Sequence, residues 1–181
     1  IFIRCFMMKE SSFYTKLYEG NSSQEKAVQC NLCGRMCRIA DGNFGFCNTQ
    51  KNMDGKLFSV NYQRIASCHT DPIEKKPLYH FLPGSSTYSI GGFGCNMTCL
   101  HCQNYIISHE YEKFDNGIKI LPETIVENAL KYNCKSIAWT YNEPTIHLPF
   151  SKKTSLLART KNLKVIYVTN GYFSDKSVEE I

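Results

Sequence analysis

Cysteine is the residue type that most constrains this chain. Ten of the 181 residues are cysteines, and seven of these fall into two short runs, Cys30–Cys47 and Cys95–Cys102. The opening residues Ile1–Met8 do not match a secretory signal, so we expect a cytoplasmic protein with reduced thiols. In that compartment, closely spaced cysteines indicate metal ligation rather than disulfides.

Charge and hydropathy exclude few partners. The formal net charge of +5 favours acidic partners weakly. Thiolates on a three-cysteine cubane and a four-cysteine zinc would lower that charge to about +2. The sequence has no dense lysine–arginine run, so nucleic acid is not indicated as a partner, and no apolar run is long enough to span a membrane.

The first half of the chain is rich in cysteine, glycine and proline. We expect an irregular N-terminus over residues 1–27 and a cysteine-rich module with a proline-stiffened loop over 28–86. Residues 56–62 alternate in polarity after an Asp54-Gly55 turn, which predicts a strand. Three prolines between residues 71 and 87 predict a rigid, extended loop. They are Pro72, Pro77 and Pro83.

From residue 87 the chain alternates between strand and helix patterns. Strands are predicted at 87–90, 136–140 and 165–169, and helices begin near Pro122, before Leu156 and at Ser174. The last strand is continuously apolar, as in a parallel strand covered on both faces. This rhythm predicts an α/β fold, the first three strand–helix units of a partial (β/α) barrel. Three strands cannot close a barrel, so we expect the core over 87–181 to be truncated and the chain alone to be weakly active or aggregation-prone.

The second cysteine run, Cys95-x3-Cys99-x2-Cys102, follows the first of these strands directly after Gly91-Gly92-Phe93-Gly94. Three thiolates on one loop can each hold one iron of a [4Fe–4S] cluster, which leaves the fourth iron open to another ligand. The carboxyl ends of parallel strands are also where α/β folds build active sites. The alternative is a zinc knuckle in which Cys99 and Cys102 combine with another cysteine pair.

This loop resembles the signature of the radical S-adenosylmethionine (SAM) superfamily. The resemblance implies that Cys95, Cys99 and Cys102 bind the cluster and that SAM chelates its open iron. The segments 71–85, 102–104 and 141–145 resemble more closely the radical SAM member of the AmmeMemoRadiSam group, near pyruvate formate-lyase-activating enzymes. The resemblance also implies an external one-electron reductant of ferredoxin or flavodoxin type. The ferredoxin-like insert of glycyl-radical activases is absent, so the substrate, protein or small molecule, stays unknown.

Two further segments are predicted to contact the cofactor. Asn142 and Glu143 end the second strand, where the resemblance implies binding of the methionyl group of SAM. The alternative is that Glu143 only complements a helix start. Thr169 and Asn170 end the third strand and resemble the Thr-Asn-Gly of activating enzymes, although an Asn-Gly turn alone would have the same sequence.

The first cysteine run predicts a second metal site. Cys30, Cys33, Cys37 and Cys47 suit tetrahedral zinc or an auxiliary iron–sulfur cluster, and a stretch with so little apolar core would depend on that metal to fold. Lys75 and Lys76, on the proline-stiffened loop with Tyr79 and His80, are either solvated or hold a charge over the barrel mouth. The remaining cysteines and histidines lack partner spacing and are expected in ordinary roles. They are Cys5, Cys68, Cys134, His69, His109 and His147.

The resemblance implies a radical SAM enzyme that cleaves SAM reductively to a 5′-deoxyadenosyl radical. The sequence identifies no residue that acts directly on the substrate. Two alternatives from other classes remain at this point. One is a non-catalytic zinc-binding module, and the other is an iron–sulfur electron carrier, which would not need a SAM site.

Overall fold

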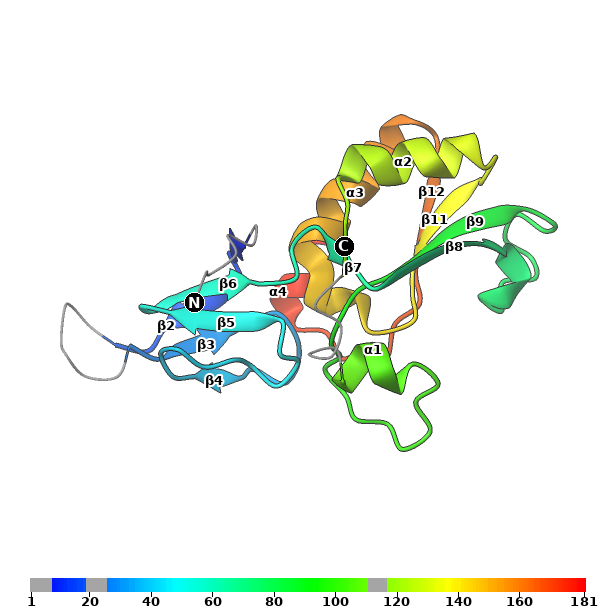
Figure 1. The fold of residues 1–181 in the computed structure, drawn as a ribbon. Coiled ribbons are helices and arrows are strands. Elements are labelled where there is room, and N and C mark those ends of the chain that lie inside the picture. The colour runs from blue at the N-terminus through cyan, green and yellow to red at the C-terminus, as the bar shows by residue number, and fades with distance from the viewer. Residues whose placement is uncertain (1–7, 19–25, 111–116) are drawn as a thin grey trace.

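The computed structural model describes residues 8–18, 26–110 and 117–181, so Cys5 lies outside the described residues. Its largest sheet has four strands in the order β12-β11-β9-β8, where β8 spans Ser67–Pro72 (Figure 1). Three parallel strands make up most of this sheet, namely β9 (Ser86–Gly91), β11 (Ser136–Trp139) and β12 (Lys164–Tyr167). The three predicted strands are therefore confirmed. The described strands form an open sheet and not a closed barrel.

Two helices cover one face of the sheet. The helix α2 (Pro122–Lys131) contacts β9 and β11, and α3 (Leu148–Thr160) contacts β11 and β12. Proline opens α2, and its apolar residues recur on one face that is buried. The short 3-10 helix η3 (Pro144–His147) precedes α3, and the final helix α4 (Asp175–Val178) starts at Ser174, whose side chain caps it as predicted.

The strands direct alternate side chains to opposite faces. Tyr88 and Ile90 of β9, with Ile137 and Trp139 of β11, belong to the apolar core that the helices complete. Ser89 lies between Tyr88 and Ile90, so it faces away from the helices. The main functional consequence is that polar side chains are buried on the face that α2 and α3 leave uncovered.

The segment after the cysteine-rich module differs from the predicted loop. It begins with β8 (Ser67–Pro72), which pairs antiparallel with β9, and passes through the 3-10 helix η1 (Ile73–Lys75). The prediction of an extended loop over residues 71–87 is therefore wrong at both ends of that range, because Pro72 and Ser86 pair with each other as strand residues. Proline is tolerated here because it ends an outer strand of the sheet.

The strand β12 also differs from expectation. We expected a strand covered on both faces, but its four residues are exposed or half-buried. The physical reason is its position, because β12 is the outermost strand of this sheet on the side of α3. The apolar side chains of β12 are therefore not fully buried by the described residues.

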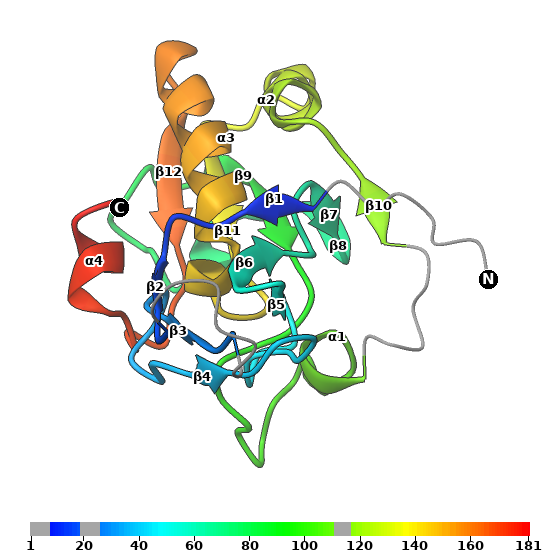
Figure 2. The same cartoon turned by 90° about the vertical axis from the view of Figure 1, so that its left-hand side faces the viewer.

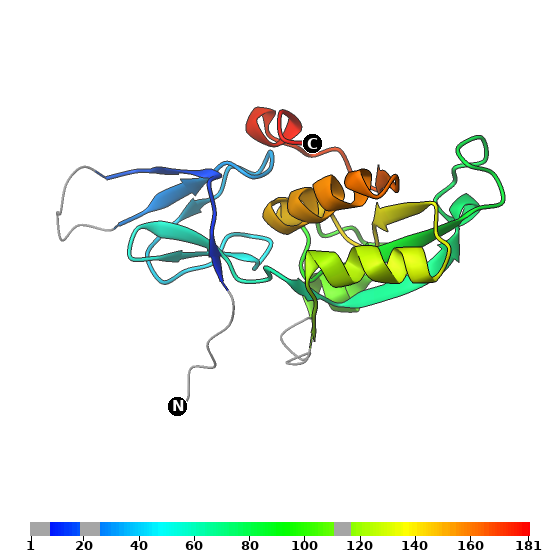
Figure 3. The same ribbon diagram turned by 90° about the horizontal axis from the view of Figure 1, so that it is seen from above.

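The N-terminal part is not irregular throughout, as was expected for residues 1–27. Two small antiparallel sheets, β1-β6-β5 and β2-β3-β4, contain strands from this region. Their bounds are β1 (Lys9–Glu10), β2 (Tyr14–Lys16), β3 (Val28–Cys30), β4 (Arg38–Ile39), β5 (Gln50–Met53) and β6 (Lys56–Ser59). Figures 1 and 3 show these sheets at one end of the molecule and the four-stranded sheet at the other.

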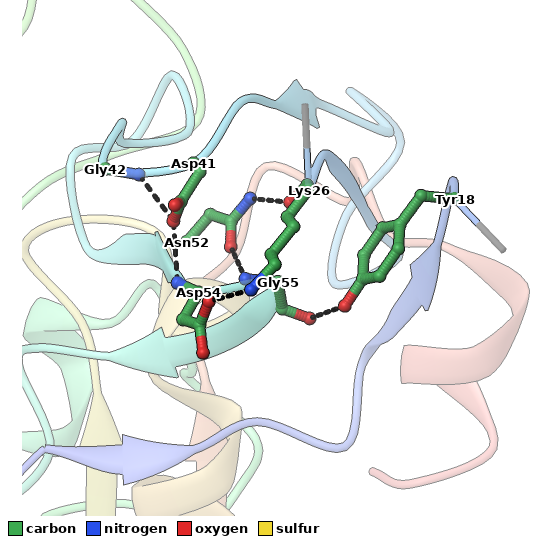
Figure 4. Close-up of polar contacts among 7 residues, drawn as sticks. All are labelled: Tyr18, Lys26, Asp41, Gly42, Asn52, Asp54 and Gly55. Atoms are coloured by element: carbon green, nitrogen blue, oxygen red, sulfur yellow. Dashed lines mark hydrogen bonds and ion pairs between the residues drawn. The ribbon is translucent and has the colours of Figure 1, made fainter. Parts of the chain in front are cut away.

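Polar contacts join the turns of this N-terminal part (Figure 4). The buried Asn52 side chain donates to the carbonyls of Lys26 (2.7 Å) and Ile39 (2.9 Å) and accepts from the amide of Gly55 (3.0 Å). Lys26 forms an ion pair with Asp54, whose amide donates to the Asp41 side chain (2.6 Å). The predicted Asp54-Gly55 turn is confirmed, since both residues have positive φ between β5 and β6.

A small apolar core supports these sheets. Its members come from segments well separated in sequence, which is why the cysteine run by itself showed little core. They are Phe13, Val28, Cys30, Leu32, Ile39, Leu57 and Leu148. The expectation that metal binding supplies much of the folding energy is therefore weakened, because packing and the Asn52 contacts also stabilise this part.

The remaining elements lie between the two ends. The strand β7 (Arg64–Ile65) pairs with β10 (Ile118–Lys119), and the helix α1 (Tyr105–His109) follows the second cysteine run. Figures 1 and 2 show the loop before α1 projecting below the sheet. The cysteine loop thus starts at the carboxyl end of β9, as predicted.

Candidate functional site

The glycine-led loop after β9 is shaped by packing within the protein. A Cβ at Gly92 would lie 2.0 Å from the His147 ring, and one at Gly94 would lie 2.3 Å from the Cys47 carbonyl oxygen. Gly94 also has a φ of +81°, which disfavours any residue with a side chain. These glycines therefore let the loop approach η3 and the N-terminal cysteine run closely.

The three thiols of this loop differ in exposure. Cys99 is exposed, whereas Cys95 and Cys102 are half-buried. Burial raises the pKa of the Cys95 thiol, and backbone amides partly offset that rise. Within residues 8–18, 26–110 and 117–181, no three Cys, His, Asp or Glu side chains gather closely enough to hold a metal ion. The ligand set Cys95, Cys99 and Cys102 stays a prediction.

Asn142 braces the same loop from the end of β11. Its amide nitrogen donates to the Gly94 carbonyl (2.7 Å), and its amide oxygen accepts from the Gly92 backbone (3.2 Å). The residue before it, Tyr141, has an unfavourable positive φ of +71°. Its ring packs against Gly91, where a Cβ would lie 2.6 Å away. The turn after β11 is therefore held in one conformation against the cysteine loop.

Glu143 joins the two segments that the sequence indicated separately. Its buried carboxylate accepts from the Thr169 hydroxyl (2.8 and 3.0 Å) and from the Asn170 amide (2.8 Å). It also accepts from the Thr145 amide (3.0 Å) and thereby caps η3, so the helix-start alternative is present as well. The ends of β11 and β12 are thus linked through one carboxylate.

A cavity of about 470 Å³ lies where these segments meet. Five of the residues predicted to contact cluster or cofactor line it, namely Cys95, Cys99, Asn142, Glu143 and Asn170. Cys102 and Thr169 are not among its lining residues. Cys102 lies 4.0 Å from the Ser108 hydroxyl, and Thr169 bonds to Glu143.

Sequence reasoning missed a polar network beside this cavity. Asp71 of β8 is buried and accepts from Lys75 (2.8 Å), Lys76 (2.9 Å), Ser89 (2.7 Å) and Tyr141 (3.1 Å). Burial by itself would raise the pKa of Asp71, but the hydrogen bonds from Lys75, Ser89 and Lys76 outweigh it and place that pKa below its usual range.

The two lysines of this network have different environments. The Lys76 side chain is only 4% exposed, so the solvated alternative is wrong for it, whereas that of Lys75 is 64% exposed. Tyr79 and His80 are exposed. The positive φ of Tyr141 is the local feature that marks this network, and it cannot be read from the sequence.

The four N-terminal thiols lie in a common environment. Cys30 and Cys33 are buried, and Cys37 and Cys47 are half-buried. Burial raises the pKa of Cys30, Cys33 and Cys47, and neighbouring thiols raise it slightly further. The thiols are therefore close enough to influence one another, although they are not gathered at metal-binding distance in the described residues.

The N-terminal cysteine run contacts the second cysteine loop directly. The central residue is the fully buried Asn96, which accepts at its carbonyl from the Arg35 guanidinium and at its side chain from Asn170 (2.8 Å). The Cys33 thiol also contacts the Asn96 side chain. The two cysteine runs and the end of β12 thus share one packed junction.

The remaining cysteines and histidines lie mainly in ordinary positions. Cys68 and Cys134 belong to the apolar core or pack against it. His147 is buried, with Nδ1 2.7 Å from the Asn61 amide nitrogen, and burial lowers its pKa to about 4. His69, by contrast, is exposed near Tyr141, with the two rings edge to face. All nine described cysteines are free thiols.

Comparison with known proteins decides the family. The model of the Radical SAM superfamily matches residues 89–181, from the middle of β9 to the end of the chain. The chain belongs to the radical SAM superfamily. The radical SAM match contains Cys95, Cys99, Cys102 and the Glu143 junction. It supports the [4Fe–4S] cluster and SAM as the cofactors that such proteins typically bind.

A curated relative extends beyond this radical SAM region. The uncharacterized protein MJ0808 of Methanocaldococcus jannaschii is 40% identical over 174 residues, which is 96% of this chain and 50% of that protein. The chain therefore spans about half the length of the curated relative that it matches. Among the described residues, no helix is both long and apolar enough to cross a membrane.

Proposed function

We propose that this radical SAM protein cleaves SAM reductively. One observation carries the proposal: a single cavity is lined by two cysteines of the predicted cluster loop and by three residues predicted to bind SAM. When bound, the cluster and SAM would supply an electron and a 5′-deoxyadenosyl radical that abstracts hydrogen from a substrate. The cavity volume is within the range of small-molecule sites.

The residues around the first cavity suit this chemistry. Thiolates are the ligands that iron–sulfur clusters use, and Cys95, Cys99 and Cys102 would supply three of them. A carboxylate suits the methionyl ammonium, and Glu143 is the carboxylate that lines the cavity. Asn142 and Asn170 add neutral polar groups beside it. Burial of Glu143 excludes water and strengthens its electrostatic interactions.

The finer assignment is also a proposal. The segment 71–85 and the Tyr141-Asn142-Glu143-Pro144-Thr145 segment support a protein like the radical SAM member of the AmmeMemoRadiSam group. A ferredoxin- or flavodoxin-like reductant would supply the electron. The exposed tip of the loop at Leu100, next to Cys99, supports access for such a partner. Free thiols throughout the described residues support a cytoplasmic setting.

Anaerobic reconstitution tests the cluster. Replacement of Cys95, Cys99 and Cys102 by Ala should remove about four irons per chain, as expected for one cubane. The matched control is Cys68→Ala, which changes a half-buried cysteine outside the loop and should retain the iron. Iron content equal in the triple variant and the parent would refute the assignment. Zinc in place of iron in the parent would support the zinc-module alternative.

We also propose that Cys30, Cys33, Cys37 and Cys47 bind a second metal, zinc or an auxiliary cluster. Their mutual proximity supports this proposal. As an arm of the same experiment, Cys30→Ala should release that metal while the four irons remain. Because Cys30 also belongs to the small apolar core, the variant should become more sensitive to protease as well. Retention of every metal by this variant would show that the four cysteines form no site.

A further inference from the structure

A second cavity, of about 630 Å³, adjoins the first and contains no cysteine in its lining. The two cavities share Lys75, Gln103, Asn104 and Tyr141 as lining residues, whereas His69 and Asp71 line only the second. We propose that this second cavity binds the substrate, and that the substrate carries a carboxylate or phosphate group which Lys75 and His69 hold. This inference rests on the proposed function, because a substrate site presupposes an enzyme. Binding of an anion to the cavity can nevertheless be measured without that activity.

Among the described residues that line the second cavity or pair with its lining, the charges leave a positive surplus. Asp71 supplies one negative charge, and it is shared between the ammonium groups of Lys75 and Lys76. The Lys76 and Asp71 side chains are 4% and 6% exposed, so Lys76 needs this carboxylate as its counter-ion. Lys75 therefore carries the uncompensated charge, and its side chain is 64% exposed at the cavity wall.

The carboxylate in the wall is already neutralised by cations. Asp71 accepts hydrogen bonds from the ammonium groups of Lys75 and Lys76, whereas the donors to Glu143 are neutral. Glu143 lines the first cavity and not the second. Among the described residues that line the second cavity, the groups that can meet a ligand with positive charge are Lys75 and, when protonated, His69. Their chemistry selects an anion.

The position of the cavity follows from the alternation of the strands. Cys68 of β8 packs against the core that the helices cover. Because side chains alternate along a strand, His69 and Asp71 both lie on the opposite face, where Asp71 contacts Ser89. His69 is paired in register with Ser89. The cavity therefore opens on the face that α2 and α3 leave uncovered, next to the carboxyl ends of β9 and β11, where α/β folds bind their ligands.

Tyr141 forms a fixed wall between the two cavities. Its hydroxyl donates to Asp71 (3.1 Å), and its carbonyl accepts from the Asn104 side chain (2.7 Å). The strained backbone of Tyr141 is therefore held from both ends. Ile106 and Ile107 of α1 line the second cavity as well, so an anionic substrate would also meet apolar surface. A ligand anchored here would lie beside the proposed SAM site.

Titration with inorganic phosphate at fixed ionic strength tests the proposal. Phosphate binding to the parent chain, followed by phosphorus NMR, should saturate. Lys75→Gln should weaken it about tenfold, the scale expected for loss of one charge-assisted hydrogen bond. Lys75→Arg should retain most of the binding, and His69→Gln should weaken it partly. The matched control is Lys153→Gln, an exposed lysine on α3, which should bind phosphate like the parent.

Three outcomes would overturn the proposal. The first is the absence of saturable binding. The second is equal weakening by Lys75→Gln and Lys153→Gln, which would mean unspecific attraction. The third is competition by SAM when the titration is repeated on the reconstituted protein, because it would assign Lys75 to the carboxylate of SAM. Undiminished phosphate binding in the presence of SAM supports a substrate subsite. Because the first titration needs neither cluster nor SAM, it does not depend on whether the proposed cleavage activity holds.

Discussion

Replacement of Asp71 by Asn is the sharpest test of the polar network beside the cavities. Asparagine has the same shape as aspartate but removes the charge that neutralises Lys76, whose side chain is 4% exposed. Leaving a buried ammonium without its partner typically costs about 3–5 kcal/mol of unfolding free energy. The ion pair to Lys75 adds little, because that side chain is 64% exposed and screened by solvent.

The assay is urea unfolding followed by tryptophan fluorescence. Trp139 is the single tryptophan of the chain and is buried in β11, so its emission reports on the sheet that carries Asp71. For a chain of this size, the expected loss corresponds to a melting temperature lower by roughly 6–20 °C. Asp71→Asn combined with Lys76→Met should recover much of the stability, since the unpaired buried charge is then absent.

A surface ion pair provides the matched control. Lys152 pairs with Glu180, and both side chains are 41% exposed. Lys152→Met should therefore cost less than about 1 kcal/mol. If Asp71→Asn costs as little as this control, the network is effectively solvated and the reasoning is wrong. The same conclusion would follow if the double variant were as unstable as Asp71→Asn alone.

Two further predictions follow from buried groups. Burial lowers the pKa of His147 from 6.5 to about 4, so stability present above pH 6.5 should fall by about 3 kcal/mol as the pH drops to 4. Urea midpoints measured across this range should show the fall, and it should be reduced in His147→Gln; an equal fall in that variant would assign it to other groups. Glu143→Gln keeps one oxygen that can accept from Thr169 and Asn170, but it loses the charge and the acceptor for the Thr145 amide; SAM affinity measured by calorimetry should weaken about tenfold while iron content is unchanged. Unaltered affinity would exclude Glu143 from the SAM site.

Local sequence signals determined much of the fold. Pro122 and the apolar spacing after it are sufficient to define α2, and Ser174 defines the start of α4. Asp54-Gly55 defines a hairpin because both residues tolerate positive φ. The spacing of Cys95, Cys99 and Cys102 after a strand led to the superfamily that the comparison shows. In each case the determining interaction lies within a few residues, so the sequence pattern records it.

Only the tertiary structure decided which distant side chains meet. Nothing near Pro72 indicates that its segment pairs with β9, because that pairing depends on a free sheet edge elsewhere in the chain. Glu143 meets Thr169 and Asn170, and Asp71 meets Tyr141, through hydrogen bonds between residues far apart in sequence. Such bonds have no period and require no particular spacing, so they leave no pattern in the sequence. The sequence by itself therefore identified the residues of the predicted cluster loop, whereas the packing of β8, β9 and β11 created the two cavities beside it.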